Sequence, residues 1–316
     1  MVSSKPPTRG KTKPPSTKPP TTKPSGGNGK AKAAHTPKSF SVAPLTGDNE
    51  GEKIVLYGKS GSGKTTLASQ VENAVFIPLD DGARKIVNPL TMEPVSAIAG
   101  VEDFQDLRDA CRQVPDLIPD GGSLVIDTIT RVQPLAEQWV VENVTLEKGG
   151  QAKNLEAFGF GKGYRHVLDQ FRLLLTDLDA VIRSGRNVIL LAQLDQSIVP
   201  NPAGTDYYEE VPKLIENKQG PVRTEVCEWA DHVIRLGYLG MDVEKDDKDA
   251  RVGKVQGDSE RAVHTGGALH FMAKTRPVSR NRKAPYRIPP VIGFENEQDS
   301  SLWQFVFDGA EIPEEE

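Results

Sequence analysis

The stretch KIVLYGKSGSGKT, residues 53–65, decides the fold that we expect of this chain. Residues 54–57 are apolar and predict a short buried strand, and the residues after 65 follow a helical pattern. Between them, glycines at 58, 61 and 63 let the backbone adopt conformations that other residues rarely reach. Successive backbone N–H groups can then point inward at phosphate oxygens. A strand, a glycine-rich loop and a helix in this order predict a phosphate-binding loop.

The phosphate-loop pattern predicts what two of the side chains bind. Lys64 is expected to reach the β- and γ-phosphates of a nucleoside triphosphate, and the Thr65 hydroxyl is expected to bind Mg²⁺. The sequence has no NKxD segment of the kind that reads guanine, which favours ATP as the nucleotide. The residues predicted to bind it are Gly58, Lys59, Ser60, Gly61, Ser62, Gly63, Lys64, Thr65 and Thr66.

Polar side chains follow three further apolar runs, each of which predicts a buried strand. The residues that end these runs are Asp80 with Asp81, then Asp127, then Gln193. Open α/β sheets bind ligands at the carboxyl ends of their strands, so we expect Asp127 to hold the magnesium ion. One of the two earlier aspartates is expected to face the γ-phosphate, although aspartate is also a favoured turn residue. Gln193 either senses the γ-phosphate or is an ordinary polar residue at a strand end.

The remaining pattern predicts a three-layer α/β domain with a mostly parallel central sheet and a late β-hairpin. Helical spacing of apolar residues predicts helices over 101–114, 129–147 and 164–183. Two further strands are predicted at 231–238 and 268–273. Proline, glycine and charged residues predict a mobile loop over 195–223, with a short element near 211–215, and an exposed hairpin in the charged insertion 242–265.

The N-terminal residues differ in composition from the rest of the chain. The first 40 residues carry eight Lys and one Arg but no Asp or Glu, among many Pro, Thr, Ser and Gly. Such a segment cannot bury enough apolar surface to offset chain entropy, so we expect a disordered basic tail over 1–48. The tail contributes +9 to a net charge of −5, which leaves −14 on the remainder. We expect the P-loop domain over 49–310 and an acidic tip over 311–316.

The sequence also bears on redox chemistry and location. Cys111 and Cys227 lie far apart and have no CxxC spacing, which predicts reduced core residues and no metal site. No run of ~18 apolar residues is present to cross a membrane. The basic N-terminus is not followed by the apolar run of a secretory signal. These features predict a soluble cytoplasmic protein with no membrane partner.

The order of the motifs resembles that of the RecA-like P-loop ATPases. The most similar members are small phage nucleotide-binding proteins, some of which act in DNA recombination and single-strand annealing. The resemblance covers residues 52–294. It implies an ATPase that uses ATP and Mg²⁺ in the bacterial host cytoplasm, with Lys64, Asp80 or Asp81, and Gln193 as catalytic residues. It also implies a homo-oligomer with ATP between subunits, in which Lys274 and Arg276 reach the neighbouring subunit's nucleotide.

Two features depart from this pattern. An aspartate stands where a longer glutamate is expected as catalytic base, which weakens water activation. Thr128 rather than glutamate follows Asp127, which argues against helicases and AAA+ proteins, because these keep two acids on one strand.

Single-stranded DNA is the partner that the resemblance implies, together with a single-strand binding or recombination protein. The basic tail and the segment 274–287, which has six cations and no acid, can contact phosphates. Tyr207, Tyr208 and Tyr286 are candidates to stack on bases. Against this stand acidic residues in the loop after Gln193, which are Asp195, Asp206, Glu209 and Glu210. The alternative is that the basic tail does not bind DNA and is a solvated linker.

Two other functions fit the same loop. A P-loop kinase would transfer phosphate to a small molecule and would close an Arg-rich lid over the nucleotide, for which the segment 274–287 is the candidate. A nucleotide-dependent packaging or regulatory ATPase would use the same site with other partners. The late position of the basic segment favours a cation that reaches a neighbouring subunit over a lid.

Overall fold

The computed structural model describes residues 41–42, 50–80, 82, 85–239, 242–244, 254–256, 260–276 and 288–308. The chain divides into two units, Met1–Leu45 and Thr46–Glu316. The ends of the expected domain, at 48–49 and 310–311, lie outside the described residues, so these boundaries stay predictions. Asp81, Tyr286, the acidic tip and most of the basic segment and basic tail also lie outside them.

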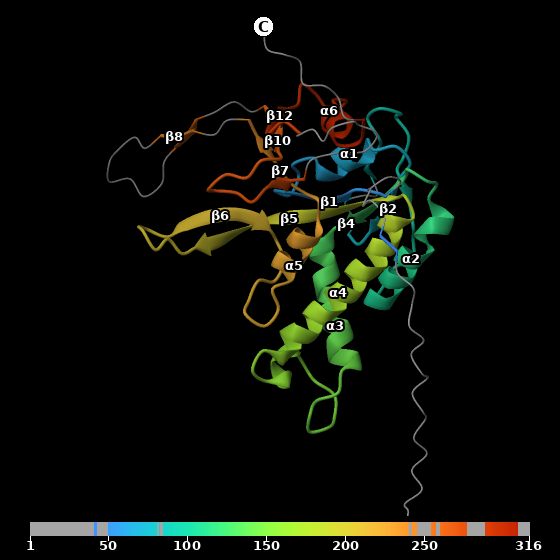
Figure 1. Cartoon of the computed structure of the whole chain (residues 1–316), viewed down its shortest axis with the longest axis vertical. Coiled ribbons are helices and arrows are strands. Elements are labelled where there is room, and N and C mark those ends of the chain that lie inside the picture. Colours follow the sequence, from blue (N-terminus) through green and yellow to red (C-terminus); the bar gives the residue numbers. More distant parts are fainter. Residues whose placement is uncertain are drawn as a thin grey trace, which may run out of the picture. The chain divides into compact units, whose positions relative to one another are not determined.

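In the described residues of the second unit, eight strands of one sheet follow the order β12-β10-β7-β1-β5-β4-β2-β3 (Figure 1). Two more strands join it, because β11 pairs with β7 and β6 pairs with β5. Its parallel strands are β1 (Lys53–Gly58), β2 (Ala74–Pro78), β3 (Ser96–Ala97), β4 (Ser123–Asp127), β5 (Asn187–Val199) and β7 (His232–Tyr238). Its antiparallel strands are β6 (Tyr207–Pro212), β10 (Arg261–His264), β11 (Lys274–Thr275) and β12 (Val291–Gly293). A separate hairpin joins β8 (Asp242–Glu244) and β9 (Lys254–Gln256). The mostly parallel α/β fold expected from the sequence is therefore confirmed.

Helices cover both faces of the sheet and complete three layers (Figure 1). One face carries α2 (Phe104–Leu117), α3 (Ile129–Asn143), the 3₁₀ turn η2 (Leu155–Phe158), α4 (Lys162–Arg183) and α5 (Val222–Trp229). The other face carries α1 (Lys64–Ser69), α6 (Ser301–Trp303) and the π-helical turn η3 (Gln304–Asp308). The indole N–H of Trp303 donates to the carbonyl of Leu67 at 2.8 Å, which ties α6 to α1.

The alternation of side chains along β1 explains why the strand is apolar throughout. Val55 and Tyr57 pack in the core under α2, α3, α4 and α5, whereas Ile54 and Leu56 pack in the core under α1 and α6. A parallel strand between two helical layers is buried on both faces, so it reads as a continuous apolar run. This burial fixes the strand that feeds the phosphate loop.

Two expectations about the later part of the domain were wrong, and a third was confirmed. Residues 195–223 do not form one continuous loop, because β5 continues to Val199 and pairs with β6, and because α5 begins at Val222. The short element expected near 211–215 overlaps the end of β6. The predicted strand at 268–273 is a turn in which Ala268 and Phe271 bridge each other, and the strand begins only at Lys274. The hairpin expected in the charged insertion is confirmed by β8 and β9.

Tyr57 connects the strand before the loop to the β5–β6 hairpin. Its hydroxyl lies 3.0 Å from the carbonyl of Glu210 and 2.5 Å from that of Met272, and its ring is fully buried. Tyr57→Phe keeps the ring but removes the donor, so we expect the free energy of unfolding to fall by about 1–2 kcal/mol. Urea denaturation measures this loss. Tyr238→Phe, at a tyrosine that is 43% exposed, is the control, and equal midpoints for both variants would contradict the prediction.

Candidate nucleotide site

The carboxyl ends of four adjacent strands meet at one edge of the sheet. Gly58 at the end of β1 is paired with Gln193 of β5, and Asp127 at the end of β4 is paired with Leu191 of β5 and Pro78 of β2. A cavity of about 400 Å³ opens at this edge. It is lined by loop residues 60, 61 and 63–66, by Asp80 after β2, by Asp127 at the end of β4 and by Gln193 within β5.

Glycine conformations shape the loop between β1 and α1. Gly61 and Gly63 have φ of +74° and +96°, in the left-handed region that favours glycine. A Cβ at Gly61 would meet nothing within 4 Å, so its glycine is required by the backbone and not by space. The buried hydroxyls of Ser62 and Thr128 have no hydrogen-bond partner among the described residues. The loop backbone and the free hydroxyl of Thr128, which lines the same cavity, fit an oxygen-rich ligand such as polyphosphate.

Lys64 lies folded back over the loop. Its Nζ donates to the carbonyls of Gly58 at 3.0 Å and Lys59 at 2.8 Å, and the residue is only 8% exposed. An ammonium group has three protons, so one remains for a ligand in the cavity. Burial lowers the pKa of Lys64, while Asp127 and Asp80 act in the opposite direction. The cation is therefore held at the cavity wall with carboxylates as its charge partners.

Thr65 and Asp127 form the contact expected of a magnesium site. The Thr65 hydroxyl donates to Oδ2 of Asp127 at 2.9 Å, and Asp127 is 3% exposed. Hydroxyl and carboxylate oxygens are the ligands that Mg²⁺ prefers, so these two residues fit the ion. No cluster of three or more His, Cys, Asp or Glu suited to a metal occurs in the described part of the chain. The remaining ligands would be phosphate oxygens and water, as is usual for Mg²⁺.

The ionised form of the Asp127 carboxyl is disfavoured where it lies. Burial raises its pKa to about 6, and the nearby charge of Asp80 acts in the same direction. The hydrogen bond from Thr65 and the charge of Lys64 lower the pKa but do not outweigh burial. A positive ion beside Asp127 would relieve this cost, because an opposite charge favours the ionised form.

Asp80 lies on the same cavity wall as Asp127. It is half-buried, and its Oδ1 accepts a hydrogen bond from the backbone N–H of Gly82 at 3.0 Å. Its charge acts on both Lys64 and Asp127, so the three groups form one electrostatic unit. The structure thus brings Asp80 to the cavity.

Gln193 lies between the loop and Asp127, as the strand order requires. Its backbone N–H donates to the Thr130 hydroxyl at 3.0 Å, and its backbone carbonyl accepts from the backbone N–H of Lys213 at 2.7 Å. The backbone is thereby fixed while the side chain faces the cavity. Thr130 was not expected from the sequence, because its role depends on the contact between α3 and β5.

The AAA domain family, AAA_24, matches residues 50–277, which is more than two thirds of the chain. The chain belongs to this family. A search of the curated proteins gave no match.

Several solved structures are similar to this AAA domain in chain trace. The RadB recombinase is 14% identical with a TM-score of 0.38, over 79% of this chain and 89% of that one. A KaiC-like protein of Pyrococcus horikoshii OT3 is 17% identical with a TM-score of 0.35, over 78% and 90%. An ATPase of the type III secretion system of pathogenic bacteria is 15% identical with a TM-score of 0.35, over 60% and 52%. Scores this low indicate nothing about what the AAA domain binds.

Lys274 and Arg276 do not line the cavity of their own AAA domain. Lys274 pairs with Val233 near the start of β7, whereas the phosphate loop lies beside the end of that strand. The Lys274 ammonium donates to the carbonyl of Glu228 at 3.3 Å, and Arg276 forms an ion pair with Asp231 at 2.6 Å. Their action on a neighbouring subunit stays a prediction.

Arg261 was missed by the sequence analysis as a site residue. Its guanidinium lies 3.1 Å from the position that a Cβ on Gly63 would take, so it lies directly against the loop. No motif surrounds Arg261; the antiparallel pairing of β10 with β7 places it there.

Cys111 and Cys227 are free and buried, as expected. In the described residues no helix combines the length and apolar character needed to span a bilayer.

Proposed function

We propose that this AAA domain binds ATP with Mg²⁺ in the 400 Å³ cavity and hydrolyses it. The contact between Thr65 and Asp127, beside the buried cation of Lys64, carries the proposal. A hydroxyl, a carboxylate and an ammonium at one end of a phosphate loop match the three requirements for holding Mg²⁺ and a triphosphate. Bound magnesium would neutralise charge on the phosphate oxygens.

The chain's own residues would bind the phosphates, orient the attacking water and accept its proton. The ammonium of Lys64 holds the terminal phosphates, and the loop amides orient them for in-line attack. Asp80 is the candidate base that orients water and accepts its proton, and the Gln193 amide orients the same water or senses the γ-phosphate. This proposal is supported by the presence of Asp80 and Gln193 in the lining of the cavity.

Asp80→Asn separates binding from turnover. The amide keeps the size of the side chain and an acceptor for the N–H of Gly82, but it cannot accept a proton. We expect ATP hydrolysis to fall about 100-fold while ATP affinity stays within about 3-fold. A phosphate-release assay beside an ATP titration measures the two quantities. Asp81→Asn is the matched variant, and an Asp80→Asn enzyme with full turnover would exclude Asp80 as base.

We further propose that ATP binding is coupled to single-stranded DNA in recombination or annealing, as in the phage proteins that the sequence resembles. The support lies in the β5–β6 hairpin, which begins directly after Gln193 and carries Tyr208, 63% exposed, and the half-buried Tyr207. A side chain that responds to the γ-phosphate is thus continuous with a strand that presents aromatic rings. Glu210 is not free to repel DNA, because it pairs with Arg235 at 2.5 Å.

Fluorescence anisotropy with labelled single-stranded DNA tests the DNA proposal. We expect binding at low salt that changes when ATP is added and that weakens as salt rises. No binding at low salt in either nucleotide state would reject DNA as the partner. Thin-layer chromatography of labelled ATP products then separates the mechanisms: phosphate released faster with DNA supports this proposal, whereas a labelled small-molecule acceptor would indicate a kinase.

We propose that the AAA domain assembles side by side with ATP between subunits. Lys274 and Arg276 lie away from their own cavity, so they can contact a nucleotide only in another copy. Light scattering after size-exclusion chromatography, with and without ATP and DNA, tests the assembly. A monomer under all conditions would contradict it.

A further inference from the structure

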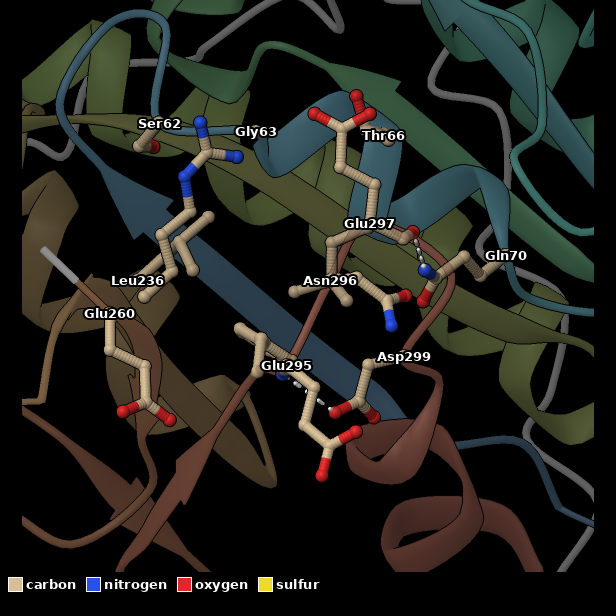
Figure 2. A pocket seen from close by; sticks show the side chains of 13 residues that line it. Ser62, Gly63, Thr66, Gln70, Leu236, Glu260, Glu295, Asn296, Glu297 and Asp299 are labelled. Carbon is tan, nitrogen blue, oxygen red and sulfur yellow. Dashed lines mark hydrogen bonds between the residues drawn. The ribbon is translucent and has the colours of Figure 1, made fainter.

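A second cavity adjoins the phosphate loop, and Asp127 does not line it. It has a volume of about 420 Å³ and lies between the loop, α1 and residues 294–299 (Figure 2). Gly63 and Thr66 line both this cavity and the one at the strand ends. A ligand whose phosphates lie against the loop can therefore extend into the second cavity.

The lining of the second cavity does not suit phosphate. Four carboxylates and one guanidinium are present, those of Glu260, Glu295, Glu297, Asp299 and Arg261. Like charges repel an anion, so the phosphates belong at the other cavity, beside Lys64. Apolar surface comes from Leu67, Leu236 and Phe294. An uncharged group with flat apolar faces and polar edges, such as a nucleobase, fits this mixture.

Gln70 presents a buried acceptor in this cavity. The residue is 9% exposed, and its Nε2 donates to the carbonyl of Glu297 at 2.7 Å. A carbonyl can only accept, so the orientation of the Gln70 amide is fixed with its oxygen on the other side. That oxygen, Oε1, has no hydrogen-bond partner in the part of the chain that the structure describes. A buried acceptor without a donor is costly and is satisfied by a ligand that supplies one.

Asn296 presents the complementary donor. Its Oδ1 accepts a hydrogen bond from the backbone N–H of Gln298 at 2.8 Å, which fixes this amide as well. Its Nδ2 group is left for the cavity. Gln70 and Asn296 both line the cavity (Figure 2). The lining thus contains one fixed acceptor and one fixed donor.

We propose that Gln70 and Asn296 select adenine over guanine in this second cavity. The inference rests on the proposed function, because it names the base of the nucleotide that the loop holds. Adenine carries an amino donor beside a ring-nitrogen acceptor, whereas guanine carries a carbonyl oxygen at the position of the amino group. Guanine would set its oxygen against Oε1 of Gln70 and leave that acceptor buried and unpaired, which a polar site rejects strongly. Neither amide can flip without losing its backbone partner.

Competition binding on the full chain tests the selection. ATP, GTP and inorganic tripolyphosphate are titrated, each with Mg²⁺, and we expect ATP to bind about 10-fold tighter than GTP or more. Asn296→Asp keeps an oxygen for the N–H of Gln298 but replaces the donor with an acceptor, so the ratio of ATP to GTP affinity should fall about 10-fold. Gln70→Met removes the acceptor at similar length and should lower the same ratio.

The matched control adds the same charge outside the cavity. Gln298→Glu changes a neighbouring amide that donates to the carbonyl of Pro89 and does not line the cavity, so the affinity ratio should not change. Equal ATP and GTP affinities in the unaltered chain would overturn the proposal. So would an equal loss of both nucleotides in Asn296→Asp and Gln70→Met with tripolyphosphate binding retained. Failure of tripolyphosphate itself to bind the unaltered chain would instead remove the proposed function.

Discussion

Lys64→Ala is expected to abolish ATP binding and hydrolysis. The ammonium is buried against the loop, where its hydrogen bonds to the carbonyls of Gly58 and Lys59 aim it at the cavity. No other ammonium lines this cavity in the described residues. Loss of one aligned donor in such a site costs about 100-fold to 1000-fold in turnover, and here a full charge is lost as well.

Lys59→Ala is the control for this prediction. Lys59 is exposed on the same loop, and the nucleotide contact expected of it is made by its backbone N–H. The variant therefore loses the same charge while it keeps that N–H and the backbone carbonyl that accepts from Lys64. Phosphate release and an ATP titration are measured for both variants. Hydrolysis by Lys64→Ala within about 3-fold of the unaltered chain would show that the site has been assigned to the wrong loop.

Asp127→Asn is expected to slow turnover strongly and to stabilise the nucleotide-free chain at the same time. The amide is a poor magnesium ligand, so hydrolysis should fall about 100-fold. The folded chain holds the Asp127 proton with a pKa of about 6 instead of 3.8, because the carboxyl is buried. Because of this shift in pKa, the ionised carboxylate of Asp127 lowers the free energy of unfolding by about 3 kcal/mol at neutral pH. An uncharged amide at the same position does not lower it.

The pH dependence of this effect has a definite sign. Between pH 4 and pH 6 the folded chain binds more protons at Asp127 than the unfolded chain does, so its stability falls as pH rises through this window. The advantage of Asp127→Asn should therefore be absent at about pH 4 and complete above about pH 6. Urea unfolding at pH 4 and pH 8 measures it, with the exposed Asp116→Asn as control. A variant that is less stable than the unaltered chain at pH 8 would contradict the burial argument.

The features that the sequence predicted well are local ones. The apolar run of β1, the glycines of the loop, and Lys64 and Thr65 lie within 13 consecutive residues, so their chemistry can be read without knowledge of the fold. Asp127 was predicted because a buried strand that ends in a carboxylate has few other uses beside such a loop. Its contact with Thr65 confirms that the two motifs meet.

The features that were missed depend on contacts between distant residues. Residues 195–199 are polar enough to read as a loop, and they form a strand because β6 pairs with them. Phe271 reads as part of a strand, but the chain turns there and its ring packs on His264 and His270. The second cavity joins α1 to residues 294–299 across more than 200 positions, through contacts such as that of Gln70 with Glu297. No local pattern predicts such a meeting.

Isothermal titration calorimetry of the full chain with Mg-ATP tests the central claim most directly. That claim is that the backbone amides of residues 58–65 and the ammonium of Lys64 bind the phosphates, and that Thr65 and Asp127 hold the magnesium ion beside them. We predict saturable binding of ATP that requires magnesium and that disappears in Lys64→Ala. A folded chain that takes up no Mg-ATP would contradict the account.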